Sequence, residues 1–592
     1  MNRTVRTRAL VVCLMLSGCY TAFSFRLVHL QVTQHGEYAA RAAEKHVNRQ
    51  VIQARRGSVV DVRGESLAQN EPVRTVVADG TLIKDRDELA DILATALDLP
   101  RAQVAERLGR QVYSQSRGKN VPDAYVVLKK QVPESVASEI AATLAARNLR
   151  GVMFEQESTR VYPNGHMLCH VLGYVNGENA GVDGVERTMD RFLRGHDGFR
   201  YTERDRTGKE IVPYRGQKKE ARNGCNVRLT IDMGLQNIVE QELDAAIKQF
   251  RPKSATIILM RPKTGEILAL ANRPNFNLNV QDKVPLDHRR NRALSDQVEP
   301  GSTFKIVTTA AALTERIVRP TTLINCENGY MSSAKLRDHH PYADLSVNDI
   351  LVKSSNIGVA KMAIQLGDQK FYEYVRRFGF GERTGVNLPG EINGTVHMPH
   401  TWSKISITRM PMGHEVAATP LQIVTAMCAI ANGGLLMMPQ IVSEIVDDQG
   451  RMVANFPPQE VRRVAAKEAT EAVNAALLQV VGPKGTAALA SVAGFKVAGK
   501  TGTSQKLGAD GRYGHDRYVS SFAGYMPAEE PAFVGLVLFD EPQAKPGQAY
   551  GGLVAAPVFS RIGEKAARYL GLVPTPEEPE GSVMAGQNVR SR

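Results

Sequence analysis

Three short clusters of hydroxyl, amine and amide side chains have the types and spacing that acyl-transfer chemistry uses. In the first, Ser302 and Lys305 stand at positions i and i+3, where "VEPGSTFKIVTTAAAL" turns into an apolar run. Because positions i and i+3 share one face of a helix, we expect the amine within hydrogen-bond reach of the hydroxyl. A serine hydroxyl becomes a nucleophile when a neighbouring base takes its proton, and a buried lysine kept neutral is such a base. The structural alternative is an N-cap serine beside a surface lysine.

The second cluster lies in "LVKSSNIGVAKMA", where Ser354 and Asn356 separate two apolar stretches. A second serine beside a Ser–Lys pair can relay a proton to a leaving amine. The asparagine amide can orient both the lysine and a peptide, since it carries donors and an acceptor. Helix capping is the alternative for both residues.

The third cluster is "VAGKTGTSQK", on a predicted strand that ends in a turn. Gly502 lets a ligand approach the backbone closely. Lys500, with the hydroxyls of Thr501 and Thr503, is suited to bind a carboxylate, and the Thr503 backbone N–H to complete an oxyanion hole. A second Lys-Thr-Gly, at 263–265, reads as a hairpin turn, so we assign it a structural role.

Taken together, the clusters carry more weight than any one of them. S-x-x-K, then S-x-N, then K-T-G, in this order along the chain, is the motif set of penicillin-binding proteins and serine β-lactamases. The sequence therefore predicts that Ser302 attacks an acyl group.

The elements that must position these residues follow from hydrophobic periodicity. We predict a strand and a long amphipathic helix at 226–250, two strands at 254–274, a helical block at about 302–440, strands at 494–506, 517–527 and 532–542, and a final helix at 555–571. This order predicts an α+β domain in which strands from both ends of the domain meet in one sheet.

The chain before residue 226 has a different pattern. "ARRGSVVDVRGESLA" predicts short strands with glycine turns, and "RDELADILATAL" and "PESVASEIAATLAARN" predict helices. We predict an amphipathic juxtamembrane helix over 31–54 and a domain boundary in the polar stretch 207–224.

The N-terminal segment predicts a membrane anchor over 9–30. "ALVVCLMLSGCYTAFSF" carries no charge, and extending the span through Arg26 gives it enough length if that side chain snorkels. The arginines before it, Arg3, Arg6 and Arg8, predict a cytoplasmic N-terminus and an exported body. A rival interpretation remains open: "LSGC", ending at Cys19, resembles a bacterial lipoprotein cleavage box.

Composition excludes several classes of function. The 592-residue chain has a formal net charge of +13, but Lys and Arg are dispersed, without the basic patch or phosphate loop that would indicate nucleic-acid or nucleotide binding. The cysteines form no C-x-x-C pair, which argues against a metal site or a disulfide framework. The Pro- and Glu-rich residues 573–592 predict a disordered tail.

Beyond the motif triplet, longer stretches resemble the class B penicillin-binding proteins, over roughly residues 26–572. The similar stretches are "NRALSDQVEPGSTFKIVTTAAAL", "SSNIGVAKMA", "FGFGERTGVNLPGE", "MGHEVAATPLQIVTAMCAIANGG", "YGGLVAAPVFSRI", "RRGSVVDVRGESLA" and "RVYPNGHMLCHVLGYV". Asn356 and "VEPGSTFK" resemble the cell-division (FtsI-like) branch, whereas the rod-elongation branch more often has Asp at that position. His414 stands where many relatives carry an aromatic residue, and we interpret it as a tolerated substitution.

The resemblance implies an α+β architecture: one N-terminal transmembrane helix, an elongated α/β pedestal, and a penicillin-binding/serine β-lactamase-like transpeptidase domain whose antiparallel sheet is flanked by helices. The expected divisions are a cytoplasmic tail (1–8), the anchor (9–30), a non-catalytic pedestal or penicillin-binding-protein dimerisation domain (31–215), the transpeptidase domain (222–572) and the tail (573–592).

The implied activity is that of a peptidoglycan D,D-transpeptidase inhibited by β-lactams. The residues that match the family motifs are the catalytic Ser302, Lys305 and Ser354 and the substrate-binding Asn356, Lys500, Thr501, Gly502 and Thr503. No metal and no cofactor is expected. The implied partners are peptidoglycan stem peptides, the lipid-linked precursor, a SEDS-family glycan polymerase and other division proteins in the bacterial inner membrane.

Several alternatives stay open at this point. They are an elongation-type transpeptidase, a carboxypeptidase that hands the acyl group to water, and a division scaffold in which catalysis is secondary. A β-lactamase would need a deacylating carboxylate, which the sequence does not identify, and the anchor and pedestal would be superfluous in it.

Overall fold

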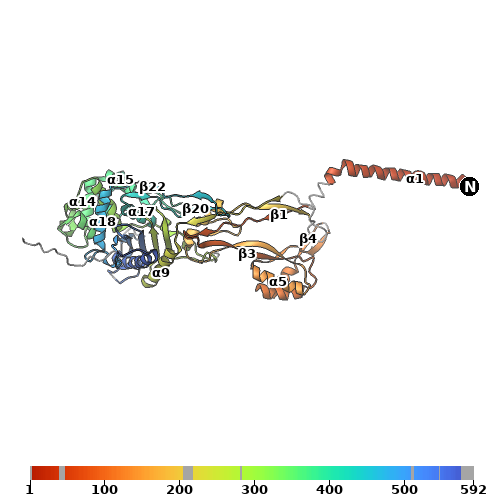
Figure 1. Cartoon of the computed structure of the whole chain (residues 1–592), viewed down its shortest axis with the longest axis horizontal. Coiled ribbons are helices and arrows are strands. Elements are labelled where there is room, and N and C mark those ends of the chain that lie inside the picture. The colour runs from red at the N-terminus through yellow and green to blue at the C-terminus, as the bar shows by residue number, and fades with distance from the viewer. Residues whose placement is uncertain are drawn as a thin grey trace, which may run out of the picture. The chain divides into compact units, whose positions relative to one another are not determined.

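The computed structural model of the chain describes residues 3–38, 47–115, 117–203, 218–280, 283–507, 513–545 and 547–574. The chain forms two compact units, one made of Met1–Arg55 with Gly195–Gly224 and the other of Arg56–Arg194 with Cys225–Arg592 (Figure 1). Most of the predicted tail at 573–592 and most of the predicted boundary at 207–224 lie outside the described residues.

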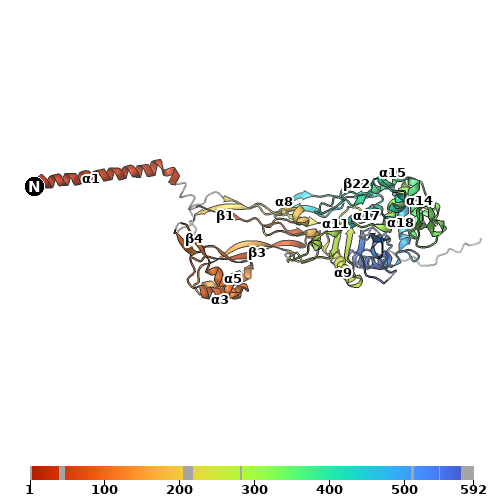
Figure 2. The same cartoon turned by 180° about the vertical axis from the view of Figure 1, so that it is seen from behind.

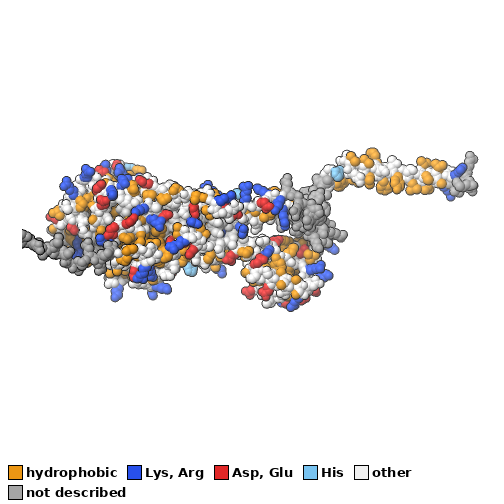
Figure 3. All heavy atoms as spheres, in the orientation of Figure 1, with side chains coloured by type: hydrophobic (Ala, Val, Ile, Leu, Met, Phe, Trp, Pro, Cys, Tyr) orange, Lys and Arg blue, Asp and Glu red, His pale blue; other side chains and the backbone are white. Residues whose placement is uncertain are grey.

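The first unit contains helix α1 (Arg3–Val28), which continues into the π-helical turn η1 (His29–Thr33). Among the described residues, Arg6–Thr33 is the one helical segment long and apolar enough to cross a membrane, with a mean hydropathy of 1.7. The predicted anchor at 9–30 falls inside it. Figure 3 shows apolar side chains along the visible face of α1 and basic side chains at its N-terminal end.

A small antiparallel sheet completes the first unit, in the order β1 (Val47–Ile52), β8 (Gly198–Glu203) and β9 (Lys218–Lys219). The helix predicted over 31–54 is therefore wrong at 47–52, since these residues pair with β8 from Val47↔Glu203 to Ile52↔Gly198. The helical pattern of "EYAARAAEKHV" does not extend into "VNRQVI", whose β-branched residues favour a strand. Residues 39–46 lie outside the described part.

The second unit begins with a twisted sheet. Its strands are ordered β21 (Met452–Asn455), β20 (Val442–Val446), β10 (Asn226–Leu229), β2 (Val59–Val60), β3 (Ser66–Ala78) and β6 (Val126–Pro133), with β7 (Val152–Val161) also paired to β3. Strand β10, predicted with the helix that follows it, thus joins this sheet and not the sheet that contains strands β11 and β12 (Ser254–Met260 and Ile267–Arg273). The predicted strands in "ARRGSVVDVRGESLA" are confirmed as β2 and the start of β3.

A separate small core lies beside β3 and β6. Helices α3 (Arg86–Leu97), α4 (Arg101–Leu108) and α5 (Glu134–Ala146) bury Leu89, Val104 and Ile140 there, against Leu128 of β6 and its neighbours. The hairpin β4 (Gln111–Ser114) and β5 (Lys119–Pro122) and the short helices α6 (Cys169–Leu172), α7 (Gly184–Thr188) and α8 (Asp190–Leu193) complete this part of the chain.

The rest of the second unit is built on a five-stranded antiparallel sheet. Its order is β12 (Ile267–Arg273), β11 (Ser254–Met260), β25 (Phe533–Asp540), β24 (Tyr513–Met526) and β23 (Ala498–Leu507). Strands from both ends of the domain therefore meet in one sheet, as predicted. Every residue of β11 and β12 is buried, because helices cover both faces of the sheet.

The covering helices come from three parts of the sequence. Helices α9 (Met233–Phe250) and α20 (Ala556–Leu570) pack on each other and on the sheet, whereas α17 (Pro420–Ala431) contacts β11, β24 and β25 (Figure 2). The helical block predicted at 302–440 contains α12 (Lys305–Thr314), α13 (Val347–Val352), α14 (Asn356–Leu366) and α15 (Asp368–Arg377), and α18 (Lys467–Val481) follows it.

Short elements fill the remaining connections. They are α10 (Leu286–Arg289), α11 (Arg292–Ser295), β13 (Leu323–Asn325), β14 (Tyr330–Met331), β15 (Leu336–Arg337), β16 (Asp344–Ser346), β17 (Thr395–Val396), α16 (Ser406–Arg409), β18 (Val416–Ala417), β19 (Leu435–Met437), β22 (Glu460–Arg463) and α19 (Gly551–Val554). The Lys-Thr-Gly at 263–265 joins β11 to β12, which confirms the predicted hairpin turn.

Candidate active site

Ser302 stands in a tight turn and not inside an α-helix. The turn η2 (Gly301–Phe304) is a 3₁₀ turn, and α12 begins only at Lys305. Gly301 has φ +57°, and a Cβ there would meet the Thr503 carbonyl oxygen at 3.0 Å, so the turn needs glycine to lie against β23. Thr303 and Phe304 are buried, while Ser302 keeps part of its surface exposed. Ser302 is therefore the one residue of this turn that stays partly accessible.

The Lys305 amine lies under this turn with no exposed surface. It donates to the Ser354 carbonyl oxygen at 2.5 Å, to Asn356 Oδ1 at 2.7 Å and to Ser354 Oγ at 3.1 Å. Within the described residues it makes no hydrogen bond to Ser302, although the i, i+3 spacing predicts one, because the S-x-N segment supplies its acceptors.

Ser354 lies between α13 and α14 in a left-handed conformation, with φ +59°. A non-glycine residue pays for this conformation in strain, and such strain is found where the surrounding structure fixes a functional side chain. Here the strained residue brings its hydroxyl to the Lys305 amine and to a second amine, Lys500 Nζ, also at 3.1 Å. The Ser354 hydroxyl is the atom that links the first two motifs to the third.

Lys500 comes from the edge strand β23 and is completely buried. The next residues of the strand form the wall beside the nucleophile. A Cβ on Gly502 would meet Ser521 Oγ at 2.4 Å and the Pro300 carbonyl oxygen at 2.9 Å, so only glycine fits there. Thr501 Oγ1 lies 3.2 Å from Thr486 Oγ1, and Thr503 Oγ1 accepts from the Gly551 amide at 3.1 Å.

Both lysines have a pKa below the ordinary lysine value. Burial, with help from the Lys500 charge, holds the pKa of the Lys305 amine well below its ordinary value, against the opposing Asp338 carboxylate. Burial alone lowers the pKa of Lys500 to about 7. A neutral amine has two hydrogens, which the two nearer acceptors, the Ser354 carbonyl oxygen and Asn356 Oδ1, can take, so the nitrogen lone pair of Lys305 is left to accept a proton. This is the state of lysine that a general base needs.

Asp338 belongs to the site, although no motif pointed to it. Its carboxylate accepts from Ser355 Oγ at 2.6 Å and from the backbone amides of Asn356 at 2.5 Å and Ile357 at 3.0 Å. It therefore accepts from the first backbone amides of α14, where a negative charge is favourable, and from the hydroxyl of Ser355, the N-cap residue of that helix. The carboxylate comes from the preceding loop, so spacing within the S-x-N motif carries no signal for it.

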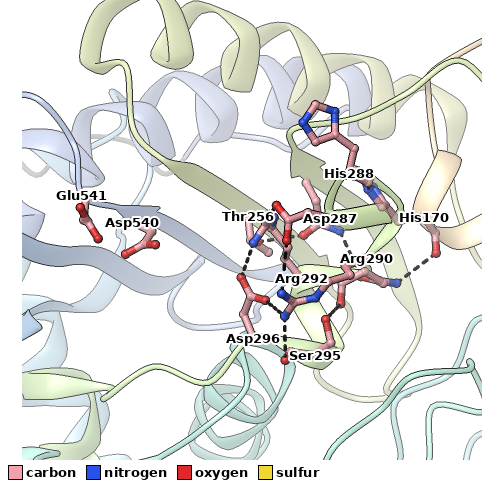
Figure 4. A network of polar contacts seen from close by, with 12 residues as sticks. His170, Thr256, Asp287, His288, Arg290, Arg292, Ser295, Asp296, Asp540 and Glu541 are labelled. Carbon is pink, nitrogen blue, oxygen red and sulfur yellow. Dashed lines mark hydrogen bonds and ion pairs between the residues drawn. The ribbon is translucent and has the colours of Figure 1, made fainter. Parts of the chain in front are cut away.

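A polar network holds the segment that leads to the nucleophile (Figure 4). Arg292 lies between the carboxylates of Asp287 and Asp296, and Arg290 bonds to the same two. Nearby, Asn291 donates to the His170 carbonyl oxygen at 3.1 Å. These bonds hold the segment 287–296, which precedes the nucleophile turn in the sequence.

His414 lies on the other side of the nucleophile turn. The Gly301 amide donates to the Gly413 carbonyl oxygen at 3.3 Å, which places residue 414 beside the turn. Burial, with the charges of Lys305 and Arg409, lowers the pKa of His414 to about 4. The imidazole is therefore neutral near pH 7 and adds no charge beside the base. That His414 is a tolerated substitution stays a prediction.

Hydrogen bonds join four of the predicted residues, Lys305, Ser354, Asn356 and Lys500. Ser302 lies in the turn that directly precedes Lys305. Strand β23 carries the other three, Thr501, Gly502 and Thr503. Among the described residues, no group of three or more His, Cys, Asp and Glu side chains is placed to hold a metal ion. The arrangement can activate one serine hydroxyl and pass a proton through a second.

Family models match both halves of the chain. Residues 255–564 match the penicillin-binding protein transpeptidase domain, and residues 51–229 match the penicillin-binding protein dimerisation domain.

The similarity to individual proteins spans almost the whole chain. It is 31% identical to the peptidoglycan D,D-transpeptidase FtsI of Escherichia coli K12, over 95% of this chain and 92% of that protein. It is 29% identical to the probable peptidoglycan D,D-transpeptidase PenA of Neisseria meningitidis, over 97% and 94%. The crystal structure of penicillin-binding protein 3 from Mycobacterium tuberculosis with ampicillin superposes with a TM-score of 0.69 at 25% identity, over 90% of this chain and 98% of that one.

Proposed function

The chain belongs to the class B penicillin-binding proteins of the FtsI-like kind, and on this premise we propose that it cross-links peptidoglycan through an acyl-enzyme on Ser302. It is a serine-type peptidoglycan D,D-transpeptidase. One observation supports the assignment of roles: Ser354 Oγ lies 3.1 Å from each of two buried amines, contributed by the first and third motifs.

In the first step, the Ser302 oxygen attacks the carbonyl carbon of the penultimate D-Ala of a stem peptide. The Lys305 amine takes the hydroxyl proton, which the depressed pKa of that amine permits. A C–O bond forms, and the carbonyl oxygen becomes an oxyanion. The backbone amides of Ser302 and Thr503, on either side of the Gly301 contact with β23, would donate to it.

In the second half of acylation, the C–N bond to the terminal D-Ala breaks. The leaving nitrogen needs a proton. The Ser354 hydroxyl supplies it and takes one in turn from Lys305, which gained the Ser302 proton in the first step. The Ser354 hydroxyl is suited to this relay because it can accept from one amine while donating elsewhere.

Substrate binding is assigned to strand β23 and to the side-chain amide of Asn356. The hydroxyls of Thr501 and Thr503 and the positive potential of Lys500 would hold the terminal carboxylate, and Asn356 would bind the donor peptide. The Lys500 amine itself donates to Ser354, so its effect on the carboxylate acts mainly through its charge. An amine on a neighbouring stem peptide then takes the acyl group and restores Ser302.

The setting of this activity is also part of the proposal. The apolar helix α1 indicates membrane anchoring, and we place the N-terminus in the cytoplasm and the catalytic domain outside the inner membrane, at the division site. A SEDS-family glycan polymerase and other division proteins are the expected partners in that membrane. An elongation role is the alternative, and Asn356 in the S-x-N motif favours division.

The test is mass spectrometry of the protein after exposure to a penicillin. We expect one covalent adduct, on the peptide that contains Ser302, and none in Ser302→Ala. The exposed Ser333 provides a matched control, since Ser333→Ala should label like the wild type. An adduct elsewhere, or an unmodified wild-type chain, would end the assignment. A division scaffold would differ in cells, because Ser302→Ala would then still complement a null strain.

A further inference from the structure

One segment outside the three motifs holds the nucleophile turn and helix α12 at both ends. At the C-terminal end of α12, Tyr374 Oη donates to the Glu315 carboxylate at 2.7 Å. At the other end, the ring of Phe380 meets the ring of Phe304 edge to face, with centroids 4.9 Å apart and planes at 61°. Phe304 is the last residue of the turn η2 that carries Ser302. The proposed chemistry uses neither contact.

The contact between Phe380 and Phe304 lies in the interior of the domain. Phe304 is 1% exposed and Phe380 is 2% exposed. Because protein interiors are close-packed, the ring of Phe380 limits how far the end of the turn can move. The start of the turn is limited by β23, since Gly301 lies against Thr503. The turn that presents the nucleophile is thus fixed at its start by the strand and at its end by Phe380.

Phe380 lies in the connection that follows α15, and hydrogen bonds fix this connection. Arg376 Nη1 donates to the Phe380 carbonyl oxygen at 3.0 Å. Gln422, on α17, donates to the carbonyl oxygens of Glu382 and Asn393, both at 2.7 Å. The Gln422 side chain amide has two hydrogens, and these two bonds use both of them. The backbone on each side of Phe380 is therefore held in place.

Arg462 ties the same connection to strand β22. Its Nε donates to the Arg377 carbonyl oxygen at 2.8 Å and its Nη2 to the Arg376 carbonyl oxygen at 3.2 Å. Both carbonyls belong to the last turn of α15, where a cation is favourable. The same guanidinium pairs with the Glu382 carboxylate. One side chain thus fastens the end of the helix and the connection that carries Phe380.

We propose that Phe380 is a positioning residue for Ser302, and that Arg462 acts by holding Phe380 against the nucleophile turn. This inference rests on the proposed function, since it concerns where the Ser302 oxygen stands when it attacks. A displacement of about 1 Å between reacting groups can slow a reaction about 100-fold. Loss of the Phe380 ring should therefore slow the covalent step and leave the preceding noncovalent binding intact.

The experiment is stopped-flow acylation of Ser302 in the full chain by a dye-labelled penicillin over a range of concentrations. The concentration dependence separates the acylation rate at saturation from the dissociation constant of the noncovalent complex. Phe380→Ala should lower the saturating rate about 10- to 100-fold and change the dissociation constant less than about 2-fold. Phe380→Leu keeps much of the apolar volume and should fall between Phe380→Ala and the wild type. A chain that merely folds less well would instead reach a lower final extent of labelling at an unchanged rate.

Variants of Arg462 test how Phe380 is held. Arg462→Met should slow the same step about 3- to 10-fold. In the Phe380→Ala background it should add less than about 2-fold, because its effect passes through the missing ring. Arg463→Met is the matched control on the same strand, since Arg463 Nη1 donates to the Gly433 carbonyl oxygen at 2.7 Å, outside this connection. Its acylation rate should equal that of the wild type.

A second control removes an aromatic contact elsewhere in the domain. Phe250 meets Phe539 with ring centroids 6.0 Å apart, and Phe250→Leu should lower the thermal unfolding midpoint without slowing acylation. If Ser302 of the wild type is not acylated, the proposed function fails. If the wild type is acylated and Phe380→Ala reaches the same saturating rate, or loses only noncovalent affinity or extent of labelling, the positioning role is overturned. Additive losses in the double variant would show that Arg462 does not act through Phe380.

Discussion

The Lys305 and Lys500 amines share one hydrogen-bond acceptor, the Ser354 hydroxyl, and this sharing has an energetic consequence for the base. The charge of Lys500 lowers the pKa of Lys305, so Lys500 acts on catalysis without touching the reacting carbonyl. A lysine is a base only above its pKa. The acylation rate should therefore rise with pH and level off well below the ordinary lysine pKa.

Lys500→Met tests this coupling. Removing the positive charge raises the pKa of Lys305, so the midpoint of the rate–pH profile should move up by about one pH unit or more. At a pH below both midpoints the rate should fall by about 10-fold for each unit of this shift, since less of the base is neutral. The measurement is stopped-flow acylation by a penicillin between pH 5 and pH 10.

The matched control is Lys506→Met, on the same strand. Lys506 bonds to Asp540 at 2.8 Å and to Glu541 at 2.7 Å, outside the Ser354 cluster, and its loss should leave the midpoint in place. Thermal stability separates this effect from misfolding, because replacing a buried amine with an apolar chain relieves desolvation and should not lower the unfolding midpoint. If the acylation rate of Lys500→Met falls while the midpoint of its rate–pH profile does not move, Lys500 does not tune Lys305 and acts only in binding the substrate carboxylate.

At the scale of elements, the sequence predicted the strands around the site well and the turns poorly. Strands β11 and β12 are short, largely apolar segments bounded by turn residues. The Lys-Thr-Gly between them forms the predicted hairpin turn. The helix that starts at Lys305 was also expected, but the 3₁₀ turn that carries Ser302 was not. Periodicity does not report the contact with Thr503 that bends the chain at Gly301.

Asp338 shows why part of the site could not be predicted. Its partners are close in sequence, but its role depends on a loop folding back over the N-terminus of α14. Nothing in the residue type distinguishes it from the exposed Asp344 nearby. The strand β1 was missed for a related reason, since its partner β8 lies far along the chain and local helix propensity dominated the prediction.

The pedestal elements depend on a buried ionic cluster. Glu186, on α7, bonds to Arg56 and Arg160 at 2.7 Å each, and the three side chains are 0%, 0% and 2% exposed. The cluster joins the segment before β2, the end of β7 and α7. Removing one partner from such a cluster leaves buried charges without compensation, which costs more than the intact cluster contributes.

Glu186→Ala should therefore destabilise the folded chain by about 3–5 kcal/mol. The expected observation is a clearly lower thermal unfolding midpoint, followed by circular dichroism. Asp91→Ala is the control, because it removes an ion pair with Arg101 that is exposed on both sides and should leave the midpoint unchanged. Equal midpoints for Glu186→Ala and the wild type would show that the cluster does not hold these elements together.

At the scale of the whole molecule, helix α1 is the candidate for anchoring the chain in a membrane. Helix α1 runs without a break from Arg3 to Val28, so Cys19 lies within it and not at its end. Large apolar side chains along it are exposed, among them Leu14 at 65%, Met15 at 68% and Phe23 at 74%. The apolar segment of 28 residues is longer than the roughly 20 residues that span a bilayer.

We therefore expect an uncleaved anchor. Cys19→Ser should stay in the membrane fraction after alkaline carbonate washing, because the apolar surface of the helix is unchanged. Leu14→Arg/Met15→Arg is the contrasting variant, since each charge near the centre of the span costs about 2.5–3.5 kcal/mol on insertion. It should shift the chain toward the soluble fraction. Mass spectrometry of the wild type should find the peptide that precedes Cys19. A chain that begins at a lipid-modified Cys19, or that leaves the membrane when this residue becomes serine, would replace the helical anchor with a lipid one.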